Sequence, residues 1–291
     1  MATTKQRAFL RVIFITILII VLLMFIPRSS FLDINYDKYN ENLKSLNETT
    51  EITETTETIK SLNSTLGFDH IYVVNLATRP DRLIKMNAMI NALNLKVEYF
   101  PAISKDNHKI LDRYNNSTYM NSTHKACYVS HYMIYSSIIY NRYDSALILE
   151  DDVDMELNIT SIMTHIHSLL PSDWDLLYIG HCMGWEGFFD QPLFDTSETF
   201  KLYPSKKPYC THGYAVSAAG ALKLIKLLAE LYLPLDLQLI SKIEEGVLKS
   251  YSVNPASIIQ TNDNPSDVSP GADFLEHKTL IHSTLHSLGL R

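Results

Sequence analysis

Ten residues near the middle of the chain constrain its fold more than any other stretch. Ser145 to Asp154 reads Ser-Ala-Leu-Ile-Leu-Glu-Asp-Asp-Val-Asp. The apolar run is typical of a buried central strand, and three carboxylates follow it at once. If the strand stays extended for two more residues, Glu150 and Asp152 face one way, roughly 6.5 Å apart, and Asp151 faces the other. Glu150 and Asp152 are therefore the expected functional pair.

Acidic oxygens at the end of a strand are hard ligands that suit magnesium, manganese or calcium. Ligands of open α/β sheets bind outside the carboxyl ends of the strands, so the position suits a ligand held through a metal. The alternative is a solvated acidic turn behind a core strand. A cavity beside the acids would separate the two interpretations.

Short apolar runs alternate with amphipathic segments along the rest of the chain, which predicts an α/β fold with a mostly parallel sheet flanked by helices. The strands are expected at His70–Leu76, Val97–Phe100, Leu147–Leu149, Asp175–Gly180, His212–Ser217 and Leu248–Val253. The helices are expected at Asp81–Leu93, Lys125–Tyr140, Asn158–Leu170, Ala218–Leu231 and after Pro234. Lys105–Thr123 and Trp185–Tyr209 are expected to form loops, and the tail beyond Pro255 is polar.

The first 67 residues are not globular in pattern. Ala8 to Ile26 is almost wholly apolar, and a helix of this length is about 28 Å long, close to the thickness of a bilayer core. Basic residues precede it and no small-residue cleavage site ends it, which favours an uncleaved signal anchor over a cleaved signal peptide. We expect a cytosolic tail (1–7), a transmembrane anchor (8–27), a low-complexity stem (28–67) and a lumenal domain (68–291).

The net charge of −7 argues against nucleic acid as a partner. Glycosylation sequons begin at Asn47, Asn63, Asn115, Asn116, Asn121 and Asn158, in keeping with a lumenal domain. The three cysteines, Cys127, Cys182 and Cys210, match no disulfide framework or zinc pattern. Three free or buried thiols are the default expectation, and Cys182 with Cys210 is the favoured pair if one bridge forms.

Six short motifs occur in an order that resembles glycosyltransferase family 25, which includes bacterial lipopolysaccharide galactosyltransferases and procollagen galactosyltransferases. The motifs are Asn75-Leu-Ala-Thr-Arg-Pro-Asp-Arg82, Cys127-Tyr-Val-Ser-His131, Leu149-Glu-Asp-Asp-Val153, Asp173-Trp-Asp-Leu-Leu-Tyr-Ile-Gly180, His212-Gly-Tyr-Ala-Val-Ser217 and Pro234-Leu-Asp236. The resemblance covers roughly residues 69–267. It implies a GT-A fold, a nucleotide-sugar donor that is often UDP-galactose, a divalent metal that is often manganese, and inversion at the anomeric carbon. The family usually has a Gly-rich segment before the second motif, and here Ser122-Thr-His-Lys125 takes its place. The resemblance does not imply a collagen acceptor.

The resemblance also suggests roles for individual residues. The donor side comprises Asn75, Arg79, Arg82, Ser130, His131, Glu150 and Asp151; the metal ligands are Asp152 and Glu150; the acceptor side comprises His212, Gly213 and Tyr214; and the general base is Asp236. Each has a structural alternative: the arginines as charges at a helix start, His131 as a packed core residue, the 212–214 segment as a plain core strand, and Asp236 as a carboxylate in the first turn of a helix.

The sequence thus predicts a metal-dependent inverting enzyme that moves a hexose, galactose in the first instance, from a nucleotide sugar to a glycan or glycoprotein hydroxyl. It is expected to be a single-pass type II membrane protein of the Golgi or endoplasmic reticulum. One alternative is a catalytically inactive, membrane-tethered carbohydrate-binding relative. The other is a haloacid-dehalogenase-type phosphohydrolase that uses Asp152 and Asp154.

Overall fold

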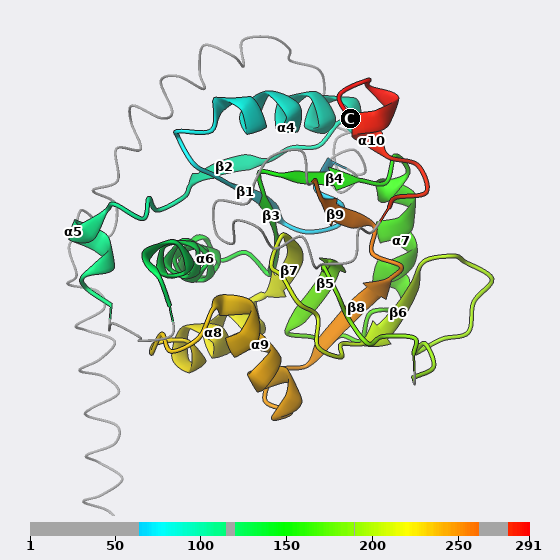
Figure 1. Ribbon diagram of the computed structural model, residues 1–291. Helices are drawn as coiled ribbons and strands as arrows, with labels where there is room; N and C mark the ends of the chain where they lie inside the picture. Colours follow the sequence, from blue (N-terminus) through cyan, green and yellow to red (C-terminus); the bar gives the residue numbers. More distant parts are fainter. Residues whose placement is uncertain (1–63, 115–119, 189, 262–278) are drawn as a thin grey trace, which may run out of the picture. The chain divides into compact units, whose positions relative to one another are not determined.

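A seven-stranded sheet lies at the centre of the described chain, with strand order β2-β1-β3-β7-β5-β8-β6 (Figure 1). The computed structural model describes residues 64–114, 120–188, 190–261 and 279–291. The strands of this sheet are β1 (His70–Asn75), β2 (Glu98–Pro101), β3 (Ser145–Glu150), β5 (Leu176–Gly180), β6 (Lys201–Pro204), β7 (Gly213–Ser217) and β8 (Ser250–Asn254).

The sheet is mixed in direction. β1 pairs in parallel with β2 and β3, and β5 pairs in parallel with β8. β7 lies antiparallel between β3 and β5, and β6 lies antiparallel to β8 at the edge. The prediction of a mostly parallel sheet therefore holds for five of the seven strands, and β6 and β7 run in the opposite direction. An apolar strand pattern does not encode direction, so the reversal of β7 could not be seen in the sequence.

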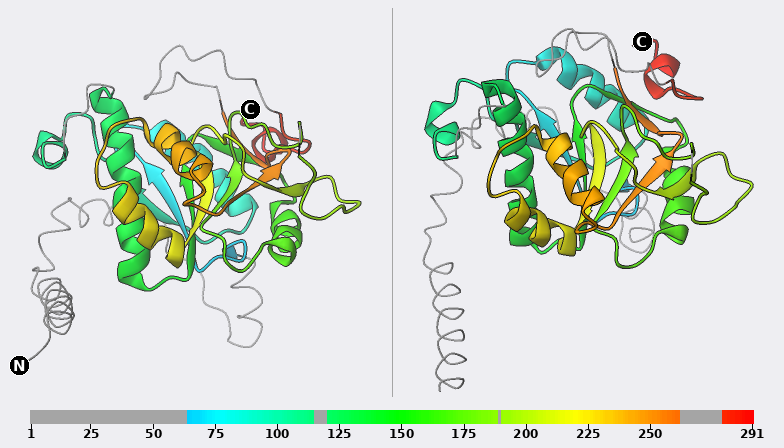
Figure 2. Two further views of the ribbon diagram at one scale, coloured as in Figure 1. Left: turned by 90° about the horizontal axis from the view of Figure 1, so that it is seen from below. Right: turned by 60° about the horizontal axis from the view of Figure 1, so that its bottom comes forward.

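The larger helices are α4 (Pro80–Ala92), α6 (Ser122–Asn141), α7 (Ile159–Leu169), α8 (Ala218–Leu227) and α9 (Leu235–Glu244). α4 joins β1 to β2, whereas α6 joins β2 back to β3, so the two crossovers run in opposite directions along the sheet. Because such crossovers are right-handed, the helices lie on opposite faces. Figures 1 and 2 show α4 on one face and α6, α8 and α9 grouped on the other.

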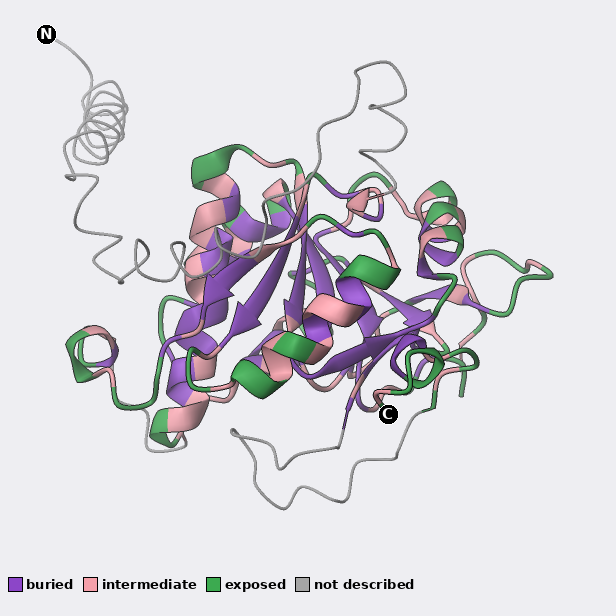
Figure 3. Cartoon of the chain, turned by 90° about the horizontal axis from the view of Figure 1, so that it is seen from above, coloured by how far each residue is buried: buried purple, intermediate pink, exposed green. Residues whose placement is uncertain are grey.

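The core follows β3, in which Ala146 to Leu149 are fully buried between the helical layers. Figure 3 shows the strands buried and the outer faces of the helices exposed. α4 begins with Pro80 at its first position, where the missing N–H costs nothing, and buries Met86, Met89 and Ile90. α6 begins where the Asn121 side chain accepts a hydrogen bond from the His124 amide, so a polar cap stands where the family's Gly-rich lead was expected.

A second, two-stranded sheet stands next to the end of β3. It pairs β4 (Val153–Met155) antiparallel with β9 (Ile258–Gln260). A short helix, α10 (Thr284–Ser287), contacts β4. The polar tail beyond Pro255 therefore contains a strand that the sequence did not predict, and Ile258 and Ile259 are buried by pairing with a strand about a hundred residues away. The expected loops at Lys105–Thr123 and Trp185–Tyr209 likewise contain α5 (His108–Leu111) and β6.

Among the described residues, no helix has the length and apolar character needed to cross a bilayer. The predicted anchor (8–27) and the stem up to residue 63 lie outside the described residues. Leu66, within the predicted stem, is 2% exposed and its carbonyl accepts a hydrogen bond from the His167 ring. Packing of the fold thus begins before residue 68.

Candidate functional site

The acidic triplet lies in a turn between two strands. β3 ends at Glu150, and β4 begins at Val153, so the strand does not continue straight through the acids as the sequence suggested. The Arg82 Nη1 atom lies 2.8 Å from Asp151 Oδ1 and 3.2 Å from Asp152 Oδ2. Because the turn breaks the alternation of side chains, Asp151 and Asp152 converge on one guanidinium instead of facing opposite ways.

Asp151 is held from two elements of the first βαβ unit. Asn75, at the end of β1, donates from Nδ2 to Asp151 Oδ2 at 2.7 Å, and Arg82 lies in the first turn of α4. Asn75 and Asp151 are buried, and the Arg82 side chain is 10% exposed. Two predicted donor-side residues are thereby brought to the acids, and removing one partner of such a buried pair costs about 3–5 kcal/mol.

Asp152 is held by residues that the sequence did not single out. Gln260, at the end of β9, donates from Nε2 to Asp152 Oδ2 at 3.1 Å, and the Thr261 amide donates to the Asp152 carbonyl at 2.6 Å. Within the described part of the chain, the buried Asp152 Oδ1 atom has no hydrogen-bond partner. The only signal for this support was the short apolar pair Ile258-Ile259 after Pro255.

Glu150 lies beside Asp152, and burial together with neighbouring negative charge disfavours the ionised form of both carboxylates. The Thr211 hydroxyl donates to Glu150 Oε1 at 3.2 Å. Burial, and then the charge of Asp152, raise the pKa of Glu150, and burial raises the pKa of Asp152 despite the nearby Arg82. A divalent cation would offset this repulsion and give Asp152 Oδ1 a partner. The residues present therefore fit a hard cation of the Mg²⁺ or Mn²⁺ type.

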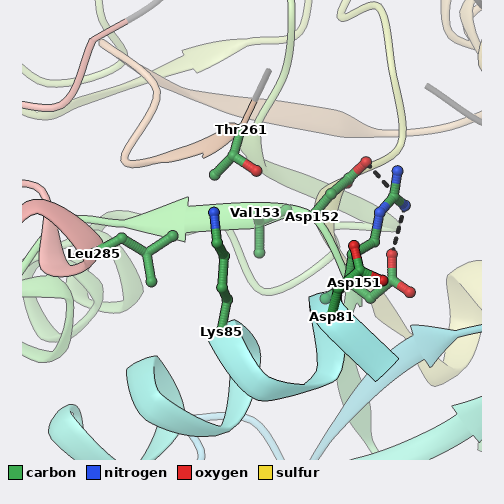
Figure 4. A pocket seen from close by; sticks show the side chains of 8 residues that line it. Asp81, Lys85, Asp151, Asp152, Val153, Thr261 and Leu285 are labelled. Carbon is green, nitrogen blue, oxygen red and sulfur yellow. Dashed lines mark hydrogen bonds and ion pairs between the residues drawn. The ribbon is translucent and has the colours of Figure 1, made fainter. Parts of the chain in front are cut away.

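A cavity of about 40 Å³ opens beside the two aspartates (Figure 4). Its lining comprises Asp81, Arg82, Lys85, Asp151, Asp152, Val153, Thr261 and Leu285. Lys85 extends from α4 toward Thr261, across the cavity from Asp152. The site therefore combines carboxylates with cationic side chains, as expected where a metal and phosphate groups bind together. Lys85 and Leu285 were absent from the sequence prediction.

Two other predicted donor-side residues are engaged elsewhere, and a third faces the triplet. Arg79 donates to both Asp81 oxygens, at 3.1 and 2.9 Å. The Ser130 hydroxyl donates to the Ala126 carbonyl and accepts from the Ile103 amide, which ties α6 to the segment after β2. His131 faces the triplet, with Nε2 3.7 Å from Glu150 Oε1. The donor-side roles of all three stay predictions.

The predicted acceptor-side segment is buried. His212 is 1% exposed and its carbonyl accepts from the Glu150 amide, whereas Tyr214 is fully buried beneath α6. Gly213 lies against Ile258, and a Cβ there would clash with that side chain. Their acceptor-side role stays a prediction, and burial favours the alternative of a core strand.

Cys182 and Cys210 form a disulfide, so the default expectation of three free thiols was wrong and the favoured pair is the one that forms.

Asp236, the predicted general base, lies in the first turn of α9 as predicted, and its Oδ2 atom accepts a hydrogen bond from the Cys210 amide at 3.2 Å. Burial, followed by the charges of Glu150, Asp236 and Asp152, raises the pKa of Cys127. Asp236 thus lies within electrostatic range of the same thiol as the triplet.

Asp154 does not reach the cavity. It is fully buried, and its carboxylate accepts from Ser283 Oγ, the Leu285 amide and Arg291. A haloacid-dehalogenase-type mechanism needs this residue as an acid facing the substrate, so the structure argues against that alternative.

The sequence from residue 68 to 239 matches the family model for glycosyltransferase family 25, described as lipopolysaccharide biosynthesis proteins. The chain belongs to glycosyltransferase family 25. It is 30% identical over 178 residues to a "Glycosyltransferase 25 family member" of Aedes aegypti, covering 55% of this chain and 28% of that protein. It is 27% identical over 178 residues to "Procollagen galactosyltransferase 1" of Danio rerio, covering 55% and 29%.

"Procollagen galactosyltransferase 2" of Homo sapiens is 26% identical over 177 residues, covering 55% of this chain and 28% of that protein. This family 25 chain thus spans less than a third of the length of these relatives. The matched residues include the acidic triplet, Arg82 and Asp236, whereas Gln260, Thr261 and Leu285 lie beyond the family match.

Proposed function

We propose that this family 25 chain is a metal-dependent inverting glycosyltransferase that moves galactose from UDP-galactose to a hydroxyl of a glycan or glycoprotein. The observation that carries the proposal is the buried Asp152 Oδ1 atom, which has no hydrogen-bond partner among the described residues. Asp152 lies beside Glu150 and lines a cavity that Lys85 and Arg82 also line. Galactose is chosen because two of the relatives are named galactosyltransferases.

Asp152, with Glu150, would hold the divalent metal, manganese in the first instance. When bound, such a metal neutralises the charge that develops on the departing nucleoside diphosphate. Arg82 and Lys85 line the same cavity and supply fixed positive charge to the diphosphate. Asn75 keeps Asp151 turned toward Arg82, so that the guanidinium stays at the cavity wall.

Inversion needs a carboxylate that takes the proton of the acceptor hydroxyl. Asp236 suits this role because it is partly exposed and, like Glu150 and Asp152, lies within electrostatic range of Cys127. General-base catalysis of this kind contributes about 10²- to 10⁴-fold to the rate.

The test is release of nucleotide from a panel of nucleotide sugars by the purified chain with Mn²⁺ and a mixture of glycan acceptors. We expect UDP-galactose to give the highest turnover. Asp152→Asn should lower metal-dependent turnover at least about 100-fold, because the metal supplies several kcal/mol to departure of the leaving group. Asp195→Asn, at a carboxylate whose side chain is 94% exposed, is the matched control and should change nothing. Wild-type turnover by Asp152→Asn would overturn the metal assignment.

We also propose that the chain is a type II membrane protein with its catalytic domain in the lumen of the Golgi or endoplasmic reticulum. The apolar stretch from Ala8 to Ile26 and its preceding basic residues support this topology. The Cys182–Cys210 disulfide supports it independently, because disulfides persist in oxidising compartments.

A further inference from the structure

Three side chains of different chemistry, one of them from the acidic triplet, lie close together at the end of β3. The Cys127 sulfur, a ring nitrogen of His131 and a Glu150 carboxylate oxygen all lie within 4.8 Å of one another. Cys127 and His131 are four residues apart on α6, so they project from one face of the helix toward the end of β3. This set differs from the oxygen-only donors at the cavity.

His131 is oriented for a ligand. Its Nδ1 atom lies 2.9 Å from the Tyr214 hydroxyl, which in turn lies 2.6 Å from the Tyr135 hydroxyl. The side chain is 1% exposed, and within the described chain the buried Nε2 atom has no hydrogen-bond partner. The distance of 3.7 Å to Glu150 Oε1 is too long for a hydrogen bond.

The Tyr214 hydroxyl fixes the His131 ring from one side, and burial lowers the pKa of the ring. In the tautomer that donates from Nδ1 to Tyr214, the Nε2 lone pair points toward Glu150. Metal-binding histidines are commonly fixed in this way, with the second ring nitrogen donating to a neighbouring oxygen.

We propose that Cys127 Sγ, His131 Nε2 and Glu150 Oε1 form a Zn²⁺ site. One sulfur, one nitrogen and one oxygen donor match zinc and not manganese or magnesium, and three protein ligands leave a fourth position for water. Binding requires that the cation displace the proton of the Cys127 thiol.

The proposed zinc site shares Glu150 with the proposed donor site. Zinc binding therefore draws Glu150 away from Asp152 and inhibits the transferase, a consequence that rests on the proposed function. The binding itself does not rest on it, so the two are tested separately.

The binding test uses Co²⁺ as a spectroscopic substitute for zinc in the purified, chelator-treated, oxidised chain. The chain has three cysteines and two of them form the disulfide, so a sulfur-to-cobalt charge-transfer band can come only from Cys127. We expect the band at one equivalent of Co²⁺, its loss on addition of Zn²⁺, and its absence in Cys127→Ala. A cobalt spectrum without a thiolate band in the wild type would overturn the proposal.

Cys127→Ser is a second variant of similar size, in case the alanine variant does not fold. A near-ultraviolet circular dichroism spectrum that matches the wild type would establish that either variant is native.

The functional experiment measures manganese-dependent UDP release as Zn²⁺ is added. We expect the zinc concentration for half inhibition to rise at least about tenfold in Cys127→Ala, since even changes outside the ligand set cost this much affinity. Equal inhibition of both proteins would mean competition at the donor site and would overturn the shared role of Glu150. A cobalt band without any UDP release would instead count against the proposed function alone.

Discussion

Asp236 is the proposed general base. Its two oxygens accept from the amides of Cys210 and Leu237, at 3.2 and 2.9 Å, which fixes the carboxylate without burying it. We predict that Asp236→Asn lowers kcat by about 10²- to 10⁴-fold, because the amide keeps the shape and loses the base. UDP affinity, measured by calorimetry with Mn²⁺, should remain nearly unchanged.

The matched control for this prediction is Asp173→Asn. Asp173 is an exposed carboxylate that pairs with Lys249 on the surface, and such pairs contribute little to stability. Its variant should retain full kcat. A parallel loss of UDP affinity and kcat in Asp236→Asn would contradict the base assignment and would indicate a donor-binding role.

At the level of single residues, the sequence predicted those that follow an apolar strand or open a helix. Asn75 and Asp151 belong to this group, and the structure joins them. Gln260 and Thr261 could not be predicted, because only the fold brings them to Asp152. Lys85 was missed because a lysine on an amphipathic helix has the same pattern whether it faces solvent or a cavity.

At the level of elements, β4 is the anchor for the end of the chain. Asp154 accepts from the Met155 and Leu285 amides and from Ser283, and Glu156 accepts from the amides of Ile281 and His282. From the sequence, Asp154 was considered only for the haloacid-dehalogenase-type alternative, and no pattern indicated a structural role for either acid. Their role follows from long-range pairing.

We predict that Asp154→Ala destabilises the fold by about 3–5 kcal/mol, because it leaves several buried donors unpaired. For a domain of this size, the melting temperature should fall by roughly 10 °C, measured by calorimetry. Asp195→Ala, at an exposed carboxylate, should shift it by no more than about 1 °C. An unchanged melting temperature combined with lost activity would instead point to a catalytic Asp154.

The disulfide links the loop before β6 to the start of β7 and, through the Cys210 amide, to Asp236. It closes a sequence separation of 28 residues, and the chain-entropy model gives about 3–4 kcal/mol for a loop of this length. We predict that Cys182→Ser/Cys210→Ser lowers both the melting temperature and kcat, since the loop that holds Asp236 loses its restraint.

Dithiothreitol provides the matched control for the disulfide. It should lower the melting temperature of the wild type toward that of the double variant and leave the double variant unchanged. If the double variant kept the wild-type kcat, the disulfide would have no part in positioning Asp236.

The strands show how far sequence patterns reach at this level. β1 and β5 were predicted to within one residue at each end and β3 to within two, because each contains an apolar run. β6 was missed, since Lys201 and Pro204 interrupt its apolar pattern and only Leu202 and Tyr203 are buried. Strand direction, set by pairing between distant segments, was not available from any of these patterns.

At the level of the whole molecule, the fold extends past the family match. That match ends at residue 239, yet the wall of the cavity needs Thr261 and Leu285, and Asp152 needs Gln260. The segment beyond the shared core therefore completes the site. Since Leu285 stands on the tail that Asp154 anchors, stability and access to the cavity are coupled in this part of the chain.

The sequons allow a test of the orientation of the whole molecule. Asn158 is exposed beside α7 and its side chain forms no cap hydrogen bond, whereas the Asn121 side chain caps α6. A lumenal domain should therefore carry glycan at Asn158 most readily, since its amide is not engaged in a helix cap.

We predict that full-length protein in microsomes shows glycosidase-sensitive forms and that Asn158→Gln removes one glycan from them. The domain after the apolar stretch should also resist added protease until detergent opens the vesicles, because the basic residues at Lys5, Arg7 and Arg11 retain the N-terminus on the cytosolic side. Asn264→Gln is the matched control, since Pro265 disqualifies that sequon and no glycan should be lost. Complete digestion without detergent, together with an absence of glycan, would place the domain in the cytosol. The same result would remove the oxidising environment that the Cys182–Cys210 bond requires.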